Sequence, residues 1–560
     1  MENTSYTICR ELVALCLSHG VRRVVLSPGS RNAPLLVAFA REKTIEHHVV
    51  VDERVAGFIA LGMATRSGEP VALVCTSGTA LLNYAPAVAE AYYRHVPLIV
   101  ISADRPEEWI DQDDSQTIRQ RGVLGAFVKP SYHLPTHTDD TSLWYARRLV
   151  NDALLQAVAP CSAPVHINVP LGGALCEVVD VAPDKPICVE DMRPEQRLSL
   201  ADATRLASAI SQAEKVLILV TMTNPLPMLQ AALSELAKLP QVVVLTESIA
   251  NLHDEAFIPT IDRVLTAIDN SEKPEFAPQL LITMGGAPVS RMVKEFLRQY
   301  APVEHWRVGC ESHVIDTMQS LTRRLPIDAA SLFTQIAPLC TPARSQYATL
   351  WSDREVVATA LHNRVVDAAP WCDLRAFASL LPAIPSGIVL HLSNGTSIRY
   401  AQLFDTPQVA ASYCNRGVSG IDGSTSTALG ASMVDEATHL LITGDMSFGY
   451  GTGALATGLA TPRFKIVVMD NGGGGIFRFI KGPSDLPELE ECFEVQRRQP
   501  IEGYAQLHGF EYFHADSEEA LQRALPQFFA ESERPAILAI TTPNEINATV
   551  LRNYMRRARV

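Results

Sequence analysis

Residues 441–447 of the chain read Leu-Ile-Thr-Gly-Asp-Met-Ser, and residues 468–473 read Val-Met-Asp-Asn-Gly-Gly. Each stretch passes from an apolar, β-branched run into glycine and an oxygen-bearing side chain, which predicts a strand followed by a loop. In an open parallel sheet, ligands bind at the edge where the carboxyl ends of the strands meet. Asp445, Asn471 and a main-chain carbonyl after them offer oxygen ligands of the kind that magnesium prefers, with phosphate completing the shell. Gly444 allows a ligand to approach the backbone closely.

Similar runs alternate with helical patterns along all 560 residues, which is typical of parallel sheets covered by helices. We predict an α/β fold with three parallel-sheet domains, at 1–182, 200–345 and 346–560, joined by proline-containing connections. The first and third domains share a strand-loop-helix pattern, which suggests related folds. The predicted strands are 23–27, 48–51, 71–75, 98–101, 216–219, 242–245, 280–283, 387–390, 440–443, 465–468 and 536–540.

The composition excludes several classes of protein. A net charge of −14 argues against a nucleic-acid partner, although a local arginine cluster can still bind a small anion. Eleven cysteines without a C-x-x-C pair argue against a disulfide framework or a zinc knuckle and fit a reducing compartment. The N-terminus shows no signal peptide, and the apolar runs are too short to span a membrane. We therefore expect a cytoplasmic protein.

A second motif competes with the metal site. Gly449 to Ala454 fits G-x-G-x-x-A after a strand, a helix is expected after it, and Asp470 stands about 20 residues further on, as in a dinucleotide-binding fold. Asp445, however, precedes these glycines and would repel a pyrophosphate unless a metal bridged the two. The metal site is favoured, while nicotinamide binding and a glycine-rich turn without a ligand stay open as alternatives.

Gly444-Asp445 followed by Asn471 resembles the G-D-x…N motif of thiamine-diphosphate-dependent enzymes. This resemblance implies that Asp445, Asn471 and the carbonyl of Gly473 ligate Mg²⁺, with Mn²⁺ able to replace it. It also implies that Gly444, Met446 and Ser447 bind the diphosphate. The chain departs from the usual pattern at Met446, where a glycine is common, and at Asp470, where many relatives carry asparagine.

Glu53 is the candidate acid that such an enzyme needs. It follows a predicted strand in the first turn of a helix, where a glutamate is often simply favoured by the helix dipole. Residues 74–83, which include Ser77, resemble the T-S-G turn of the pyrimidine-binding domain in this superfamily. The resemblance implies that Glu53 shares a proton with the cofactor's aminopyrimidine ring, with Ser77 nearby. It also implies the domain order pyrimidine-binding, middle, diphosphate-binding, in a homodimer or homotetramer whose active sites are shared between subunits.

Four arginines lie on loops that follow predicted strands. Each alone is more often part of a surface ion pair, but together Arg31, Arg105, Arg399 and Arg416 favour an anionic substrate, since guanidinium groups bind carboxylates bidentately. The helix that follows Ser30 and Arg31 would point its first N–H groups at such an anion.

The surrounding segments S-P-G-S-R, S-A-D-R-P and N-R-G-V-S-G-I-D-G resemble the 2-succinyl-5-enolpyruvyl-6-hydroxy-3-cyclohexene-1-carboxylate synthases of menaquinone biosynthesis. The resemblance implies a transferase that decarboxylates 2-oxoglutarate and adds the succinyl carbanion to isochorismate, releasing CO2. Some relatives carry Lys-Arg where this chain has Arg291-Met292, so one basic contact is missing or supplied differently. The implied contacts are Arg399 and Arg416 for 2-oxoglutarate; Ser30, Arg31, Arg105, Gln116 and Arg291 for isochorismate; Ile421 beneath the cofactor; and Ile476 and Phe477 as walls of the substrate cavity.

Three alternatives remain open at the level of the sequence. A 2-oxo acid decarboxylase often carries a histidine pair after the activating glutamate, but the loop at 107–120 has none, and His47-His48 precedes Glu53 in a predicted strand. An acetohydroxyacid synthase would usually retain coloured FAD. A catalytically inactive, regulatory relative is disfavoured by the presence of Glu53, Asp445 and Asn471 together.

Overall fold

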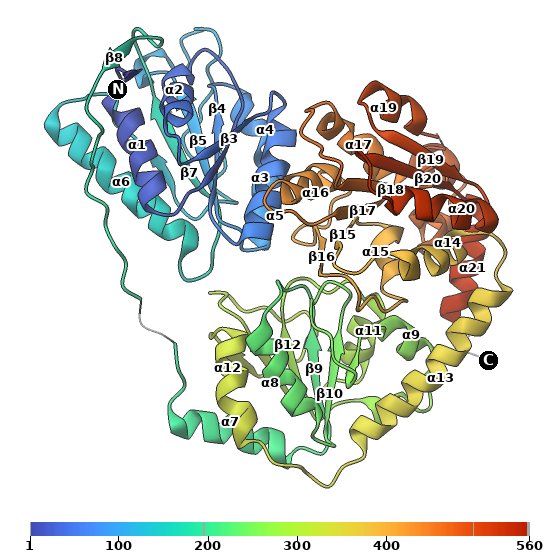
Figure 1. The fold of residues 1–560 in the computed structure, drawn as a ribbon. Coiled ribbons are helices and arrows are strands. Elements are labelled where there is room, and N and C mark those ends of the chain that lie inside the picture. Colours follow the sequence, from blue (N-terminus) through green and yellow to red (C-terminus); the bar gives the residue numbers. More distant parts are fainter. Residues whose placement is uncertain (1, 194–195, 497, 557–560) are drawn as a thin grey trace. The chain divides into compact units, whose positions relative to one another are not determined.

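The computed structural model describes residues 2–193, 196–496 and 498–556, and the chain forms two compact units. Unit 1 holds the residues up to 193 together with 417–436 and 450–463. Unit 2 holds 194–416, 437–449 and 464–560. Figure 1 colours the chain from its N-terminus to its C-terminus, and the two units are described separately below.

Unit 1 is built on a six-stranded sheet in the order β3-β2-β4-β5-β7-β6, in which all neighbouring strands are parallel. Helices α1, α2 and α6 cover one face, where they bury a core of alternate strand residues. A short antiparallel pair, β1 with β8, ties the two ends of the segment 2–180 together. The elements are β1 (Glu2–Thr4), β2 (Arg23–Leu26), β3 (Glu46–Val49), β4 (Val71–Cys75), β5 (Leu98–Asp104), β6 (Ser131–His133), β7 (Val165–Pro170), β8 (Val178–Asp180), α1 (Thr7–Ser18), α2 (Ala33–Arg41), α3 (Glu53–Ser67), α4 (Ala80–Asn83), α5 (Ala85–Tyr93) and α6 (Asp140–Val158).

Helix α3 is buried on nearly all sides, because within unit 1 it is covered by the sheet, by α5 and by α16 (Ser424–Ser432). Two glycines make the crossing of α3 and α16 possible. A Cβ on Gly62 would lie 1.9 Å from the carbonyl oxygen of Thr427, and a Cβ on Gly430 would lie 2.0 Å from that of Ile59. The backbones therefore approach more closely than any side chain would allow.

Unit 2 contains two further six-stranded parallel sheets. The middle sheet has the order β11-β10-β9-β12-β13-β14, so its first strand, β9, lies beside its fourth, β12. This is the 3-2-1-4-5-6 order of doubly wound folds, in which ligands bind where the winding direction reverses. The strands are β9 (Val216–Val220), β10 (Val242–Thr246), β11 (Phe257–Ile258), β12 (Leu280–Met284), β13 (Glu304–Val308) and β14 (Arg323–Leu325), with helices α7 (Leu200–Gln212), α8 (Pro227–Ala237), α9 (Ile261–Thr266), α10 (Lys273–Phe276), α11 (Arg291–Gln299) and α12 (Ala329–Ile336).

The third sheet has the order β16-β15-β17-β18-β20-β19. Counted within each sheet, this is the same strand order as in the first sheet, which supports the expectation of related folds. Helix α13 (Tyr347–Ala368) leads into it from the middle sheet. The other elements are β15 (Val389–Leu392), β16 (Ala411–Cys414), β17 (His439–Gly444), β18 (Phe464–Asp470), β19 (Glu511–Ala515), β20 (Ala536–Thr541), α14 (Asp373–Leu380), α15 (Thr396–Ala401), α18 (Ile476–Phe479), α19 (Ile501–Leu507), α20 (Glu518–Phe529) and α21 (Asn544–Arg556).

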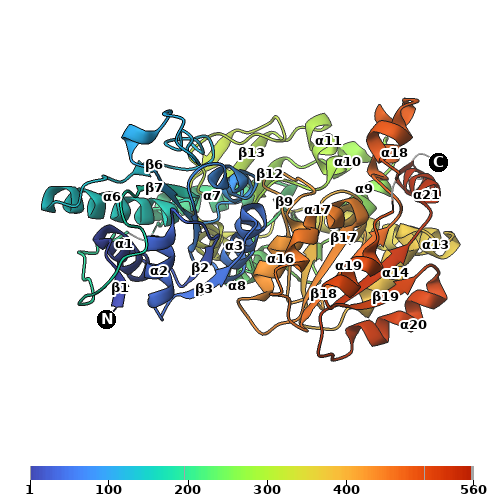
Figure 2. The ribbon, with the colours of Figure 1, turned by 90° about the horizontal axis from the view of Figure 1, so that it is seen from above.

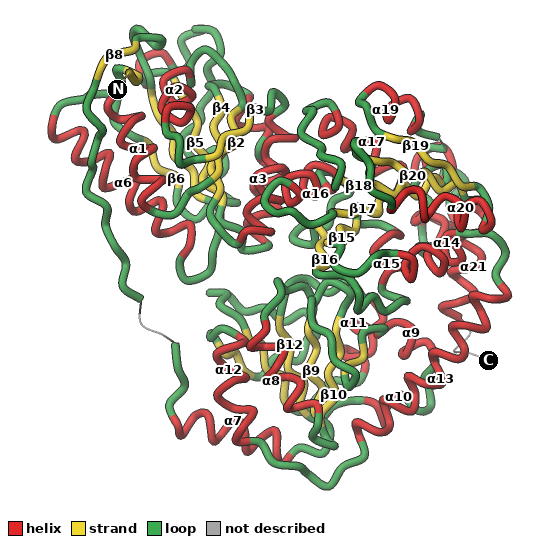
Figure 3. The backbone as a smooth tube through the Cα atoms, viewed as in Figure 1, coloured by secondary structure: helices red, strands yellow, loops and turns green. Residues whose placement is uncertain are grey.

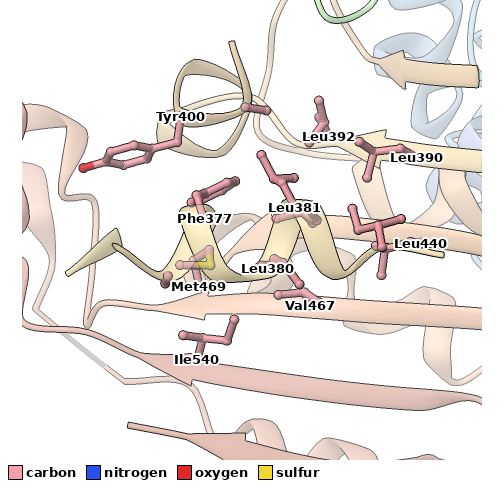
Figure 4. Close-up of a cluster of buried hydrophobic side chains, with 14 of the residues drawn as sticks. Phe377, Leu380, Leu381, Leu390, Leu392, Tyr400, Leu440, Val467, Met469 and Ile540 are labelled. Carbon is pink, nitrogen blue, oxygen red and sulfur yellow. The ribbon is translucent and has the colours of Figure 1, made fainter. Parts of the chain in front are cut away.

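The core of the third sheet forms where α14 and α20 pack side by side (Figures 1 and 2). Figure 4 shows Phe377 and Leu380 of α14 above Val467 of β18. Phe377 also stacks on Tyr400 with ring centroids 5.3 Å apart. These side chains hold β17 and β18 rigidly, and with them the loops at their carboxyl ends.

The predicted α/β fold with three parallel sheets is confirmed, and Figure 3 shows the strands of each sheet between layers of helices. The predicted domain boundaries stay a prediction. Within the described ranges, none of the helices combines the length and apolar character that crossing a membrane requires. Buried free thiols at Cys9, Cys16, Cys75 and Cys372 pack in the cores as small apolar groups.

One local expectation is wrong. Helix α17 (Asp445–Leu455) begins at Asp445, so the G-x-G-x-x-A segment lies inside a helix and not in a turn before one. Its glycines allow close packing within unit 1, because a Cβ on Gly451 would lie 2.2 Å from Oγ1 of Thr425. The segment therefore lacks the loop that a dinucleotide pyrophosphate requires.

Candidate active site

Asp445 lies where β17 ends and α17 begins, and only 2% of its surface is exposed. Its Oδ1 accepts a hydrogen bond from the N–H of Met446 at 2.7 Å, and its Oδ2 accepts from the N–H groups of Gly472 and Gly473 at 2.9 and 2.8 Å. The structure thus joins the two quoted strand ends. Burial raises the pKa of Asp445 to about 7, against the effect of these hydrogen bonds and with a further contribution from Asp470. A cation beside the carboxylate would offset this cost.

Asn471 follows β18 and is also buried. Its Nδ2 donates to Oδ2 of Asp373 at 3.2 Å, and a carboxylate only accepts, so the amide oxygen must point the other way. That Oδ1 is buried and has no hydrogen-bond partner among the described residues. An unpaired buried oxygen costs about 1–3 kcal/mol, which a metal ion would recover. The side chains present therefore fit a divalent cation.

Open space beside Gly444 also fits a bound ion or ligand at this site. Apart from its two chain neighbours, no atom of the described residues lies within 4 Å of the position where Gly444 would carry a Cβ. The carbonyl of Gly473 accepts the N–H of Gly475 at 2.8 Å. Over the part of the chain that the structure describes, no cluster of three or more His, Cys, Asp or Glu residues could hold a metal. The candidate site instead combines one carboxylate with amide and main-chain oxygens.

Asp373, which orients Asn471, was not predicted. It begins α14, where its N–H donates to Oδ1 of Asn547 at 2.7 Å and its Oδ1 accepts from Oγ1 of Thr542 at 2.6 Å. Burial raises the pKa of its carboxyl group, opposed by the hydrogen bonds from Thr542 and Asn471. No local pattern relates residues so distant along the chain.

Two of the predicted arginines come together in unit 2. Arg416 is 8% exposed and donates to Oδ1 of Asn394 at 2.9 Å and to the carbonyl of Pro288 at 3.2 Å, while its buried Nε has no partner among the described residues. Arg399 donates to the carbonyl of Gly395. The two cations therefore bind adjacent residues, and burial and then the charge of Arg416 lower the pKa of Arg399, opposed by Asp262.

The remaining predicted residues of unit 2 lie nearby or at the surface. Ser447 donates to Oγ of Ser393 at 3.4 Å, which connects the ends of β17 and β15. Ile476 and Phe477 begin α18 and are half-buried, and the Phe477 ring lies 5.6 Å from that of Phe493. Arg291 begins α11, where its side chain is 75% exposed and pairs with Glu295 at 2.6 Å.

In unit 1, Glu53 is the first residue of α3. Asp52 caps the helix by accepting the N–H groups of Arg54 and Val55 at 2.9 and 3.2 Å. Oε2 of Glu53 accepts from Nδ2 of Asn83 at 3.1 Å. Since Asn83 ends the segment that resembles the T-S-G turn, the structure brings the two predicted elements of unit 1 into contact.

Ser77 in that turn is 2% exposed, and the N–H of the next residue, Gly78, donates to Oε1 of Gln120 at 2.7 Å. Gln120 is buried and also donates to Oδ1 of Asn168 at 2.8 Å. Asn168 in turn donates to Oδ2 of Asp104 at 2.7 Å. This polar network, which sequence reasoning missed, links the ends of β4, β5 and β7.

The predicted arginines of unit 1 are also neighbours. Arg31 donates to the carbonyl of Leu171 at 2.9 Å, and its pKa is lowered by burial and then by the charge of Arg105. Arg105 is ion-paired with Asp114. Gln116 lies beside Gly78, Ser30 is exposed before α2, and Ile421 is 38% exposed on the loop before α16.

Known proteins with similar sequences identify the family. Residues 7–123 match the family model described as "Thiamine pyrophosphate enzyme, N-terminal TPP binding domain". A 2-succinyl-5-enolpyruvyl-6-hydroxy-3-cyclohexene-1-carboxylate synthase from Porphyromonas gingivalis is 43% identical over 96% of this chain and 94% of its own. The chain belongs to this synthase family. Synthases of the same name from Christiangramia forsetii and Flavobacterium psychrophilum are 38% and 37% identical, over 99% and 98% of both chains.

The family predicted from the sequence motifs is therefore confirmed. The match at 7–123 also supports thiamine diphosphate as the cofactor. It covers the segment that holds Glu53, Ser77 and Arg105, whereas Asp445 and Asn471 lie in the part matched by the full-length synthases.

Proposed function

We propose that this protein decarboxylates 2-oxoglutarate and joins the remaining succinyl unit to isochorismate, giving 2-succinyl-5-enolpyruvyl-6-hydroxy-3-cyclohexene-1-carboxylate and CO2 in menaquinone biosynthesis. The observation that carries the proposal is the buried pair Asp445 and Asn471, whose amide oxygen has no partner among the described residues, in a chain that matches synthases over nearly its full length.

Asp445, Asn471 and the carbonyl of Gly473 would hold Mg²⁺ or Mn²⁺, and the metal would hold the diphosphate. Gly444 leaves room for the diphosphate, and Met446 and Ser447 in the first turn of α17 would lie beside it. Ser447 would add a hydroxyl donor. Ile421 would support the cofactor from beneath.

When bound, thiamine diphosphate supplies a carbon nucleophile and takes up the electrons left when CO2 departs. Glu53 would hold a proton between its carboxyl oxygen and the pyrimidine ring of the cofactor, with Ser77 beside the ring. Asn83 orients the Glu53 side chain through its hydrogen bond to Oε2. The acid thus has one fixed direction at the start of a rigid helix.

Both substrates are dicarboxylates, which accounts for the arginines. Arg399 and Arg416 would bind 2-oxoglutarate, since they bind adjacent residues and the buried Nε of Arg416 has no partner among the described residues. The isochorismate contacts would come from Ser30, Arg31, Arg105, Gln116 and Arg291. Ile476 and Phe477 would form an apolar wall that excludes water from the reacting carbons.

We also propose a cytoplasmic homodimer or homotetramer in which each active site takes Glu53 from one subunit and Asp445 from another. The predicted pyrimidine-binding, middle and diphosphate-binding domains at 1–182, 200–345 and 346–560 belong to this proposal.

The test is to supply 2-oxoglutarate, isochorismate, thiamine diphosphate and Mg²⁺ and to follow CO2 release and isochorismate loss together. Equal amounts of both support the proposal. CO2 release that does not depend on isochorismate would point to a plain 2-oxo acid decarboxylase, and the absence of both would overturn the activity.

A further inference from the structure

Helix α11 starts at the ligand-binding edge of the middle sheet, after β12. Ser290 caps the helix by accepting the N–H of Val293 at 3.0 Å. Glu247, which directly follows β10, accepts the N–H groups of Val289 and Ser290 through Oε1 at 2.8 and 2.9 Å. The first turn of α11 is therefore fixed beside the point where the winding of this sheet reverses.

Lys294 lies one turn into this helix and is partly buried. It has no hydrogen bond or ion pair in the ranges that the structure describes. Its pKa is lowered by burial first and then by the charge of Arg416, with a smaller contribution from Arg399; Glu247 opposes this shift. Arg416 donates to the carbonyl of Pro288, three residues before α11, so it lies at the end of the helix that carries Lys294, and none of the described acids is ion-paired with Lys294.

The acids around these three cations do not balance them. The acids near these cations are Glu247 and Asp262. Burial raises the pKa of Glu247 to about 7, and this carboxylate accepts the backbone N–H of Ser290. Asp262 accepts the hydroxyl of the same serine. Burial also raises the pKa of Asp262. Both acids already accept hydrogen bonds from residues at the start of α11, and the buried Nε of Arg416 has no acceptor among the described residues. Buried positive charge in excess calls for an anionic ligand.

We propose that Lys294 binds the C5 carboxylate of 2-oxoglutarate together with Arg399 and Arg416, and thereby selects dicarboxylic over monocarboxylic 2-oxo acids. This inference rests on the proposed function. The C1 carboxylate leaves as neutral CO2, so cations around it would stabilise the reactant more than the transition state and slow the reaction. The C5 carboxylate keeps its charge throughout, and binding it costs nothing at the chemical step.

Arg291, on the same helix, does not provide this contact in the structure, because its exposed side chain pairs with Glu295. Lys294 supplies the additional cation from one turn further along α11.

The experiment compares Lys294→Ala and Lys294→Arg with the wild type in the full-length protein loaded with thiamine diphosphate and Mg²⁺. Lys238→Ala is the matched control, since Lys238 flanks the same sheet but is 67% exposed and pairs with Glu235. Steady-state kinetics would give KM for 2-oxoglutarate and for isochorismate, and CO2 release would compare 2-oxoglutarate with 2-oxobutyrate, which lacks the C5 carboxylate.

We expect Lys294→Ala to raise KM for 2-oxoglutarate about 10- to 100-fold, as for a lost charged hydrogen bond, and to leave KM for isochorismate unchanged. The preference for 2-oxoglutarate over 2-oxobutyrate should fall by a similar factor, and Lys294→Arg should restore most of it. An unchanged KM for 2-oxoglutarate, or equal increases for both substrates, in an active enzyme would overturn the role of Lys294 alone. An inactive wild type would overturn the proposed function instead. If Lys294→Ala does not fold, Lys294→Arg and Lys294→Met replace it. Wild-type selectivity in Lys294→Arg together with lost selectivity in Lys294→Met would support the role of Lys294, and equal selectivity in the two variants would reject it.

Discussion

The first and third sheets have the same strand order but different chemistry at their carboxyl ends. In the third sheet the third and fourth strands lead to Asp445 and Asn471, both buried and each held by neighbours. In the first sheet the corresponding strands lead to Ser77 and Arg105, and the key acid, Glu53, follows the second strand with a single side-chain partner. Topology thus decides where ligands collect, and the side chains decide which part of a ligand each edge can bind.

Because of this difference, we expect the two edges to bind different parts of the ligand. The third sheet presents buried oxygens with unmet partners, which suits a cation and the diphosphate it carries. The first sheet presents the Glu53 carboxyl group at the start of a helix, which in the proposed function shares a proton with the cofactor. Variants at the two edges should therefore fail in different ways.

The largest effect is expected for Asp445→Ala. Without the Asp445 carboxylate, the third-sheet edge should bind thiamine diphosphate in Mg²⁺ at least about 100-fold more weakly, and turnover should vanish. Isothermal titration calorimetry with and without Mg²⁺ measures this. Wild-type affinity in the variant would refute the metal site, and removal of Mg²⁺ with a chelator should reproduce the variant in the wild type.

Glu53→Gln should separate catalysis from binding. The amide keeps the shape and the contact with Asn83 but cannot share the proton, so turnover should fall about 100- to 10,000-fold while cofactor affinity stays within a few-fold. Calorimetry and steady-state kinetics on the same preparation provide the comparison. A variant with normal turnover would remove Glu53 from the mechanism, and one that loses cofactor binding would move it to the binding site.

Asp373→Asn tests whether the orientation of Asn471 matters. An asparagine at 373 can donate as well as accept, so the Asn471 amide loses its fixed direction, and Mg²⁺-dependent cofactor affinity should fall about 10- to 100-fold. Thermal unfolding in the absence of cofactor serves as the control. A lower unfolding midpoint with unchanged cofactor affinity would mean that Asp373 only supports α14. Turnover at saturating cofactor should stay near that of the wild type.

The smallest effect is expected from the glycines of α17. Gly451→Ala should destabilise the protein by about 1–2 kcal/mol, because overpacking against Thr425 outweighs the gain in helix propensity. Gly503→Ala in α19 is the matched control: its Cβ meets only Pro500 at 3.9 Å, so it should stabilise by up to about 1 kcal/mol. Thermal unfolding measures both, and nicotinamide dinucleotides should leave the wild-type midpoint unchanged. A midpoint raised by such a dinucleotide would restore the alternative that the helix argues against.

Local patterns were sufficient for much of the fold because fully buried strands carry uninterrupted apolar runs. β4, β9, β10 and β12 begin at the predicted residues and end within one residue of the prediction. β7 was missed because His166 and Asn168 interrupt its apolar pattern. Both are nevertheless fully buried, since Ser102 donates to Oδ1 of Asn168 and shares a second hydrogen bond with Nε2 of His166.

The sequence by itself determined the alternation of strands and helices, the oxygen-bearing residues after the strands and the family to which the chain belongs. These features depend on residue type and short spacing, which are visible without coordinates. The tertiary structure alone decided that the glycine-rich segment is helical and that Asn471 donates to Asp373, which leaves its amide oxygen without a partner among the described residues. It also decided that Lys294 is partly buried while Arg291 is exposed and pairs with Glu295. Each of these depends on contacts between residues far apart in the chain, and no local pattern specifies which distant side chain will fill a given space.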